Sequence, residues 1–267
     1  MRLLSRDPPP VRTGGTGSGG RHVRGRLGIQ GAIFMQTIQD AFAAAFHLIV
    51  TLNAGLMEIV LLSLRVSLTA VLCAALIGLP LGAGLALFQF PGRRFAAIVL
   101  SSLMGMPPVV VGLIVYLLLS RSGPLGVFGL LFSPTAMILA QIVIVTPIIA
   151  ALTRQLVEDL WTEYREQLQS LGCGPRRAIA TLLWDGRFSL MTALLAGFGR
   201  ASAEVGAVMI VGGNIDHVTR MMTTAIALET SKGDLALALG LGIILIILSL
   251  GVNGAAFVIR DLAGRHP

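Results

Sequence analysis

Long uninterrupted apolar runs restrict most strongly what this chain can fold into. A helix of about 20 apolar residues, rising 1.5 Å per residue, crosses the hydrocarbon core of a bilayer. Five runs approach or exceed that length, at residues 60–88, 95–119, 134–152, 188–211 and 235–259. Only 12% of the residues are charged, whereas soluble domains carry about a quarter. We therefore predict an all-α polytopic membrane protein with five transmembrane helices, or six if the apolar segment 41–55 also crosses.

Prolines interrupt three of these runs. Pro80 lies in the first run, the pair Pro107-Pro108 near the middle of the second, and Pro147 in the third. Two adjacent prolines remove two backbone donors, so the second helix must break there and have its free groups satisfied by neighbours or by a water-lined cavity. We expect the first helix, which contains Pro80, to be long, tilted or kinked, and the third to bend at Pro147.

The net charge of +7 is concentrated at the N-terminus. Residues 1–34 contain six arginines and one aspartate among many glycines and prolines, which argues for a disordered leader rather than a nucleic-acid-binding surface. This leader lacks the apolar stretch of a signal peptide. We expect synthesis to begin at Met35, residues 35–58 to form an interfacial helix or to lead into the membrane, and residues 59–267 to form the transmembrane domain.

The arginines and lysines of the loops predict the orientation. One side carries nine of them: Arg93, Arg94, Arg154, Arg165, Arg176, Arg177, Arg187, Arg260 and Arg265. The other side carries four, namely Arg65, Arg121, Arg220 and Lys232. Because cytoplasmic loops are enriched in positive residues, the segment 154–187 and the C-terminus are predicted to face the cytoplasm.

This segment, 154–187, is the longest polar stretch of the membrane domain. Its pattern predicts two short amphipathic helices joined by a glycine-rich turn, in which Gly172 can adopt positive φ and Pro175 suits the first turn of the second helix. A rigid helix–turn–helix between two spans is suited to binding another protein. The alternative is an ordinary charged loop.

Residues 166–172, EQLQSLG, resemble the EAAxxxG coupling motif of ABC importer permeases. Gln167 and Leu168 replace the paired alanines, and Trp184-Asp185 stands where many relatives have Leu-Pro. The resemblance implies that this segment docks into a groove of a cytoplasmic ATPase subunit. The implied coupling residues are Glu163, Glu166, Leu171, Gly172, Pro175 and Arg176.

Residues 197–215, GFGRASAEVGAVMIVGGNI, are similar to the molybdate and tungstate branch of these permeases. Residues 219–233, TRMMTTAIALETSKG, resemble tungstate-type permeases in particular. The resemblance covers roughly residues 55–260. It implies the type I ABC importer architecture in the cell membrane, a homodimer, two ATPase subunits that bind ATP and Mg²⁺, and an extracytoplasmic oxyanion-binding protein.

Arg200 and Glu204 stand one helical turn apart in an otherwise apolar run. Ionisable groups at that depth are costly and usually pair or line a pathway, so we predict an ion pair with either a structural role or a part in gating. The following loop offers glycines, hydroxyls and one cation near the outer mouth. Candidates for the translocation path or gate are Arg200, Glu204, Gly212, Gly213, Asn214, Thr219, Arg220, Thr223 and Thr224. The loop could serve as a low-affinity path or as a docking surface for an anion-binding protein. For the loop, a capped turn with a re-entrant or interfacial helix is the structural alternative.

Other classes of protein fit the sequence less well. No phosphate-binding GxxxxGK[ST] loop occurs, so the chain is not expected to be an ATPase or to hold a cofactor. The two cysteines and four histidines have no metal-ligand spacing, and no catalytic motif appears within a span. We predict a permease for a tetrahedral oxyanion, with tungstate as the first candidate and molybdate or sulfate as the alternative. A passive channel or a secondary transporter is the rival class, although no inverted repeat is evident.

Overall fold

The computed structural model describes residues 39, 42–43, 46 and 54–264. The leader 1–34, the start at Met35 and most of the segment 35–58 lie outside these residues. Within them the chain is helical and has no strand. The helices are α2 (Ala54–Leu87), α3 (Arg93–Met104), α4 (Pro108–Leu119), the 3₁₀ helix η1 (Gly126–Phe128), α5 (Pro134–Ser170), α6 (Pro175–Asp185), α7 (Arg187–Ser202), α8 (Gly206–Gly212), α9 (Met222–Lys232) and α10 (Leu235–Gly264).

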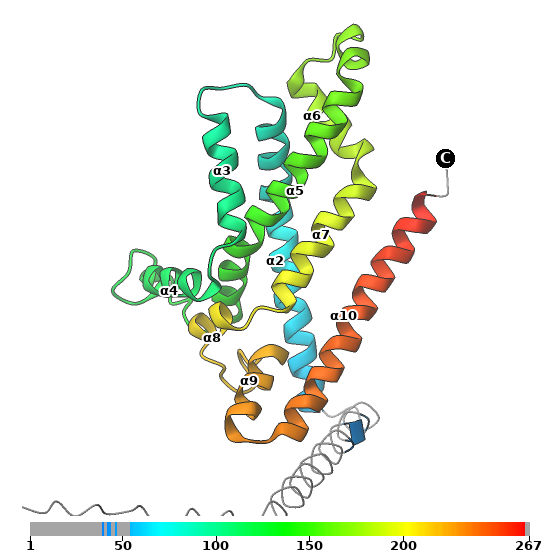
Figure 1. Ribbon diagram of the computed structural model, residues 1–267. Helices are drawn as coiled ribbons and strands as arrows, with labels where there is room; N and C mark the ends of the chain where they lie inside the picture. Colours follow the sequence, from blue (N-terminus) through cyan, green and yellow to red (C-terminus); the bar gives the residue numbers. More distant parts are fainter. Residues whose placement is uncertain (1–38, 40–41, 44–45, 47–53, 265–267) are drawn as a thin grey trace, which may run out of the picture.

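The helices form an elongated bundle with two distinct ends (Figure 1). Helices α2, α5 and α7 run along its length, with α3 beside one face and α10 on the opposite side. The turn between α5 and α6 lies at one end, and α9 lies at the other. By the distribution of arginines, the α6 end is predicted to face the cytoplasm and the α9 end to face outward.

Three described helices are long and apolar enough to cross a membrane: α2, α5 and residues 235–258 of α10. Two bent pairs, α3 with α4 and α6 with α7, raise the number to five if each pair is one span. The all-α polytopic prediction is therefore confirmed. The possible sixth crossing at 41–55 lies largely outside the described residues.

Close packing of α2 against α5 forms the centre of the bundle. A Cβ atom added to Gly78 would lie 3.1 Å from Ile149, and one added to Gly82 would collide with the backbone oxygen of Ala150. Small residues one turn apart let two helices approach closely where water is absent, and van der Waals contact then stabilises the pair. Pro80 and Pro147 both lie inside these continuous helices.

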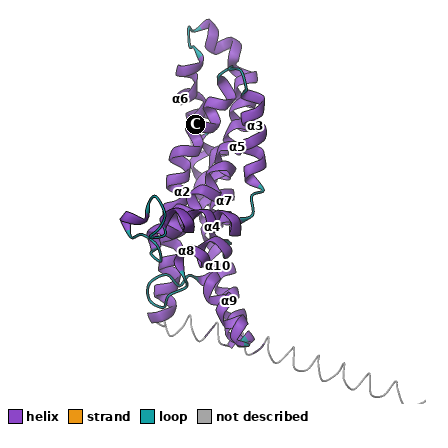
Figure 2. Cartoon of the chain, turned by 90° about the vertical axis from the view of Figure 1, so that its left-hand side faces the viewer, coloured by secondary structure: helices purple, strands orange, loops and turns teal. Residues whose placement is uncertain are grey.

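The predicted break at Pro107-Pro108 is confirmed. Helix α3 ends at Met104, α4 begins at Pro108, and their axes are bent by 99°. Figure 2 shows α4 lying across the bundle rather than along it. Helix α4 packs on α8 at Gly112, where an added Cβ would lie only 2.6 Å from Cα of Ala207.

The cytoplasmic segment differs from the prediction in its first half. Residues 154–170 do not form a separate short helix, because α5 continues unbroken from Pro134 to Ser170. No proline or glycine stands between the apolar part and the polar part, and Arg154 pairs with Glu158 one turn later at 2.8 Å. The third span and the cytoplasmic helix are therefore one rod, which connects the membrane directly to the turn.

The fourth span differs as well. The run 188–211 was expected to be one helix, but α7 ends at Ser202 and α8 begins at Gly206. The carboxylate of Glu204 accepts a hydrogen bond from the backbone N–H of Ala207 at 3.1 Å, which starts a new helix. The polar loop after α8 also contains a helix, α9, whose first turn is buried.

Candidate functional site

Two backbone hydrogen bonds end helix α5 at the turn that follows it. Gly172 has φ +71°, its N–H donates to the carbonyl of Gln169 at 3.0 Å, and the N–H of Cys173 donates to the carbonyl of Leu168 at 2.8 Å. This is the Schellman arrangement, which needs a left-handed residue that glycine adopts without steric cost. Pro175 then opens α6 at its first turn, as the sequence predicted.

Helix α6 folds back onto the cytoplasmic ends of α2 and α5. Ala178 and Leu182 are fully or almost fully buried in a cluster with Leu87 and Val157. Gly186, at the end of α6, lies close to the side chain of Leu160. Because both sides of the turn are packed against long helices, a force applied at the turn is transmitted into α2 and α5.

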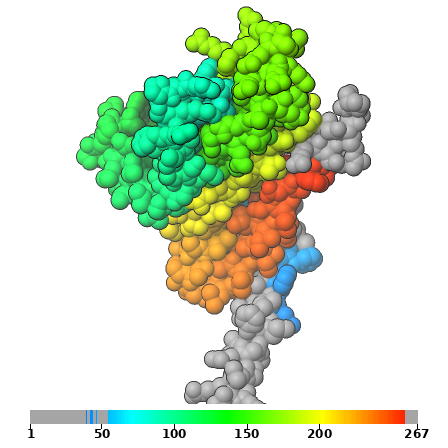
Figure 3. Space-filling model, turned by 45° about the horizontal axis from the view of Figure 1, so that its top comes forward, coloured from blue at the N-terminus to red at the C-terminus, as the bar shows by residue number. Residues whose placement is uncertain are grey.

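The residues predicted for coupling share one property, which is exposure at this end. They are Glu163, Glu166, Leu171, Gly172, Pro175 and Arg176. Leu171, at the turn itself, is 81% exposed. A hollow of about 500 Å³ is lined by Phe88, Gly172, Gly174, Pro175, Arg176 and Arg177. Figure 3 shows α5 and α6 projecting together at the top of the molecule.

The surface around the turn carries both signs of charge. Glu163 and Glu166 precede the turn, whereas Arg176 and Arg177 follow it. The negative charge of Glu163 raises the pKa of the neighbouring Tyr164 phenol. The coupling role of the six residues stays a prediction, but their exposure on a rigid turn is what contact with another protein requires.

The helix break between α7 and α8 lies next to the break between α3 and α4. A Cβ atom added to Gly206 would lie 2.8 Å from Val109, the second residue of α4, so the two helix starts are in contact. Discontinuous helices in membranes are tolerated where neighbouring groups satisfy the free backbone. The structure thus brings together two interrupted helices that the sequence showed only in part.

The predicted pair Arg200–Glu204 is present at this break. Nη2 of Arg200 is 3.4 Å from Oε2 of Glu204, whose side chain is only 3% exposed while that of Arg200 is 33% exposed. The other carboxylate oxygen caps α8 through Ala207. Glu204 therefore fixes the shape of the break and satisfies its own charge, which accounts for an acidic group at this depth.

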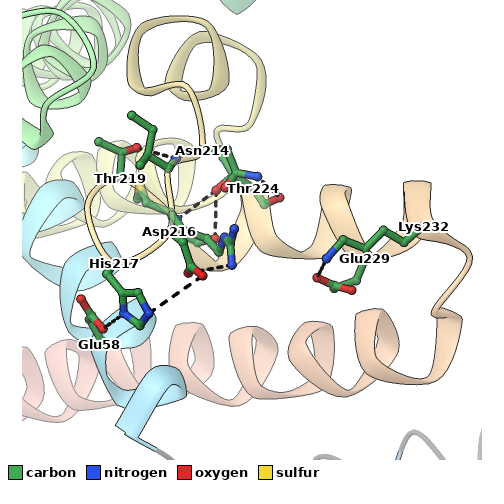
Figure 4. Close-up of polar contacts among 11 residues, drawn as sticks. Glu58, Asn214, Asp216, His217, Thr219, Thr224, Glu229 and Lys232 are labelled. Carbon is green, nitrogen blue, oxygen red and sulfur yellow. Dashed lines mark hydrogen bonds and ion pairs between the residues drawn. The ribbon is translucent and has the colours of Figure 1, made fainter.

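The predicted outer loop forms a compact turn that connects α8 to α9, and Figure 4 shows its polar contacts. Gly213 has φ +70° and Asn214 has φ +49°, and the side-chain amide of Asn214 donates to the carbonyl of Thr224 at 3.5 Å. The hydroxyl of Thr219 donates to the carbonyl of Gly212 at 2.6 Å. An added Cβ on Gly212 would touch Met137 of α5, so close backbone approach explains that glycine.

The hydroxyls of Thr219, Thr223 and Thr224 are all used inside the protein. Thr223 donates to the carbonyl of Glu204 at 3.0 Å, and Thr224 exchanges bonds with the backbone of Met221. These bonds form the capped turn that the sequence offered as the structural alternative to a role in the anion path. A direct role of the loop in the anion path stays a prediction.

A charged cluster on the outer face was not found from the sequence. Nδ1 of His217 lies 2.7 Å from Oε2 of Glu58, and Nη1 of Arg220 lies 2.7 Å from Oδ1 of Asp216 (Figure 4). The hydrogen bond to Glu58, together with the negative charge of Asp216, raises the pKa of His217 above its ordinary value of 6.5. His217 has φ +58°, so the pair holds the loop to α2 in a conformation that non-glycine residues seldom adopt.

Ser63 was also missed. Its hydroxyl accepts a hydrogen bond from the N–H of Met222 at 2.9 Å and donates to the carbonyl of Ile59 at 2.7 Å. The serine thus caps the first free donor of α9 from another helix. Residues 159 positions apart give no local signal, and only the helix contact reveals this pair.

The residues that the structure describes include no group of three or more His, Cys, Asp or Glu side chains placed to hold a metal ion.

Three known proteins share most of their length with this chain. The tungstate uptake system permease protein TupB of Peptoclostridium acidaminophilum is 39% identical over 227 residues, which is 85% of this chain and 100% of that protein. A probable anion ABC transporter permease protein of Haloferax volcanii is 43% identical over 77% of this chain and 91% of its own length. TupB of Campylobacter jejuni is 38% identical over 83% of this chain and 92% of its own length.

More distant similarity extends to other anion permeases. The molybdenum transport system permease protein ModB of Escherichia coli is 28% identical over 78% of this chain and 96% of its own length. No protein-family model matches the chain. The chain belongs to the family of membrane-embedded ABC transporter permeases that includes TupB.

Proposed function

We propose that this chain is the transmembrane permease subunit of an ATP-driven importer of tungstate. The relatives named for tungstate uptake match this chain over nearly their whole length, whereas those named for molybdenum and sulfate transport share fewer of its residues. Molybdate and sulfate are the alternative cargoes, because tetrahedral dianions differ little in size and charge.

The observation that carries the proposal is the exposed, rigid turn between α5 and α6. Leu171 projects from a fully bonded turn whose two helices are packed on the membrane bundle. We propose that a cytoplasmic ATPase subunit, which binds ATP and Mg²⁺, grips this turn through Glu163, Glu166, Leu171, Gly172, Pro175 and Arg176. The permease itself then needs no nucleotide site.

The transport cycle that we propose is alternating access in a homodimer. An extracytoplasmic binding protein delivers the dianion to the outer end, and closure of two ATPase subunits pulls on the continuous helix α5. The breaks at Pro107-Pro108 and at Glu204 are the points where α4 and α8 can change direction without unwinding a helix. Arg200 becomes available to an anion only when it separates from Glu204.

The test is uptake of tungsten and molybdenum in a strain that lacks this gene and carries plasmid-borne variants. Both oxyanions are supplied together at nanomolar concentration, and cellular metal is measured by elemental mass spectrometry. Wild-type protein should restore tungsten selectively. If only molybdenum uptake were restored, molybdate rather than tungstate would be the transported anion. If uptake of neither metal were restored, import of these oxyanions by this chain would be refuted.

Energy coupling needs a second arm. The same strain is tested with a partner ATPase whose phosphate-binding lysine is replaced, and tungsten uptake should fall to the level of the deletion strain. Uptake that persists without ATP hydrolysis would favour a channel or a secondary transporter.

A further inference from the structure

One buried hydrogen bond connects the outer helix α9 to the break between α7 and α8. The hydroxyl of Thr223 donates to the backbone carbonyl of Glu204 at 3.0 Å, and the Thr223 side chain is 7% exposed. Glu204 stands outside both helices, and its own side chain is held by Arg200 and Ala207. Thr223 therefore contacts the break at the residue that organises it.

The first turn of α9 is buried, whereas its far end is exposed. Met221, Met222 and Thr224 are almost completely buried, and Ser63 of α2 caps the N–H of Met222. The last residues of α9, from Thr230 to Lys232, are exposed at the outer end of the molecule. A helix of 11 residues is about 16 Å long, so α9 reaches from the break to the outer surface.

We propose that Thr223 is a positioning residue of the transport cycle, through which the extracytoplasmic helix α9 sets the shape of the break between α7 and α8. A partner that contacts the outer end of α9, such as the oxyanion-carrying protein, acts on the Arg200–Glu204 pair through this bond. The inference rests on the proposed import function and gives Thr223 a role other than direct contact with the anion.

Two neighbouring threonines supply a matched comparison. Thr224 is fully buried and Thr223 is 7% exposed, but the hydroxyl of Thr224 bonds to the backbone of Met221 at the start of α9 and not to Glu204. Thr223→Val and Thr224→Val each remove one hydroxyl at nearly constant volume. Thr223→Ser keeps the donor and serves as the conservative variant.

Hydrogen–deuterium exchange of the full chain in nanodiscs measures opening of the break directly. Loss of one buried hydrogen bond should shift a local opening equilibrium by about fivefold. We expect backbone amides 203–207 to exchange about fivefold faster in Thr223→Val and at the wild-type rate in Thr223→Ser. Thr224→Val should speed exchange mainly in the first turn of α9, and it should open the break less than Thr223→Val does. Unchanged exchange at the break in Thr223→Val, or equal opening in Thr224→Val, would overturn the proposal.

Transport supplies a readout that a purely structural role would not change. In proteoliposomes with the ATPase subunits and the binding protein, Thr223→Val should import less tungstate per ATP hydrolysed than the wild type, while Thr223→Ser should keep the wild-type ratio. An unchanged ratio in Thr223→Val would refute the role in transport. If wild-type protein imports no tungstate, the proposed function fails, whereas the exchange experiment still decides whether Thr223 sets the shape of the break.

Discussion

Nη2 of Arg93 lies 2.6 Å from Oε1 of Glu158, and this ion pair joins the start of α3 to the cytoplasmic part of α5. The same guanidinium group donates to the carbonyls of Leu85 and Ala86 at the end of α2. Three helices therefore meet at one side chain. The two charged side chains are about one-third exposed, so water weakens the attraction but the geometry is specific.

Replacing Arg93 by alanine should lower the free energy of unfolding by about 1–2 kcal/mol, because two carbonyls and one carboxylate lose a shared donor. Thermal unfolding of the purified chain in detergent measures the change. Arg94→Ala is the matched control, since Arg94 is exposed on the adjacent position of α3. If Arg93→Ala and Arg94→Ala lowered the stability equally, the hydrogen bonds and the ion pair of Arg93 would not stabilise the fold specifically.

Replacing Gly172 by valine should abolish tungsten uptake while membrane insertion is retained. A β-branched residue is strained at φ +71°, so the turn must change shape. Gly172→Asn should keep most activity, because asparagine tolerates this region. Uptake and membrane-fraction abundance are measured for each variant.

Gly92→Val controls for backbone strain as such. Gly92 has φ +92° in another cytoplasmic turn, and an added Cβ there meets nothing within 4 Å. If Gly92→Val reduced uptake as much as Gly172→Val, the loss would be general strain, and the coupling role of the α5–α6 turn would be refuted.

Gly112→Ala should destabilise the contact between α4 and α8 by about 1–3 kcal/mol, because the added Cβ would lie 2.6 Å from backbone Cα of Ala207. Gly242→Ala on α10, where nothing lies within 4 Å, should leave stability unchanged or raise it by up to about 1 kcal/mol. Thermal unfolding distinguishes the two. A harmless Gly112→Ala would mean that the two helices separate at low cost.

The pair His217–Glu58 should make the outer loop sensitive to pH. The pKa of His217 is raised in the folded protein, so the stabilisation is complete below 6.5 and is lost as pH rises through the raised value. Titration of the imidazole by NMR in nanodiscs should give a pKa above 6.5 in the wild type and a lower value in Glu58→Gln. Asp216→Asn should lower it less, because the hydrogen bond to Glu58 is the larger cause. An unchanged pKa in Glu58→Gln would contradict the pairing.

Local features of the structure were predictable from the sequence. The apolar runs predicted the spanning helices, the pair Pro107-Pro108 predicted a break, and Gly172 with Pro175 predicted the cytoplasmic turn. The break and the turn depend on the residues themselves, because proline has no backbone N–H to donate and glycine has no Cβ. The spacing of Arg200 and Glu204 likewise predicted their ion pair.

The tertiary structure decided where helices end and which polar groups meet. An apolar run shows that a segment avoids water, but it does not show whether its helix continues, so both the unbroken α5 and the break at Glu204 were missed. The pairs Ser63–Met222 and His217–Glu58 join residues 159 positions apart. Their formation depends on packing between α2 and the outer loop. The sequence by itself therefore determined that this chain lies in a membrane and turns at fixed residues, whereas only the packed bundle determined what holds its helix break in place.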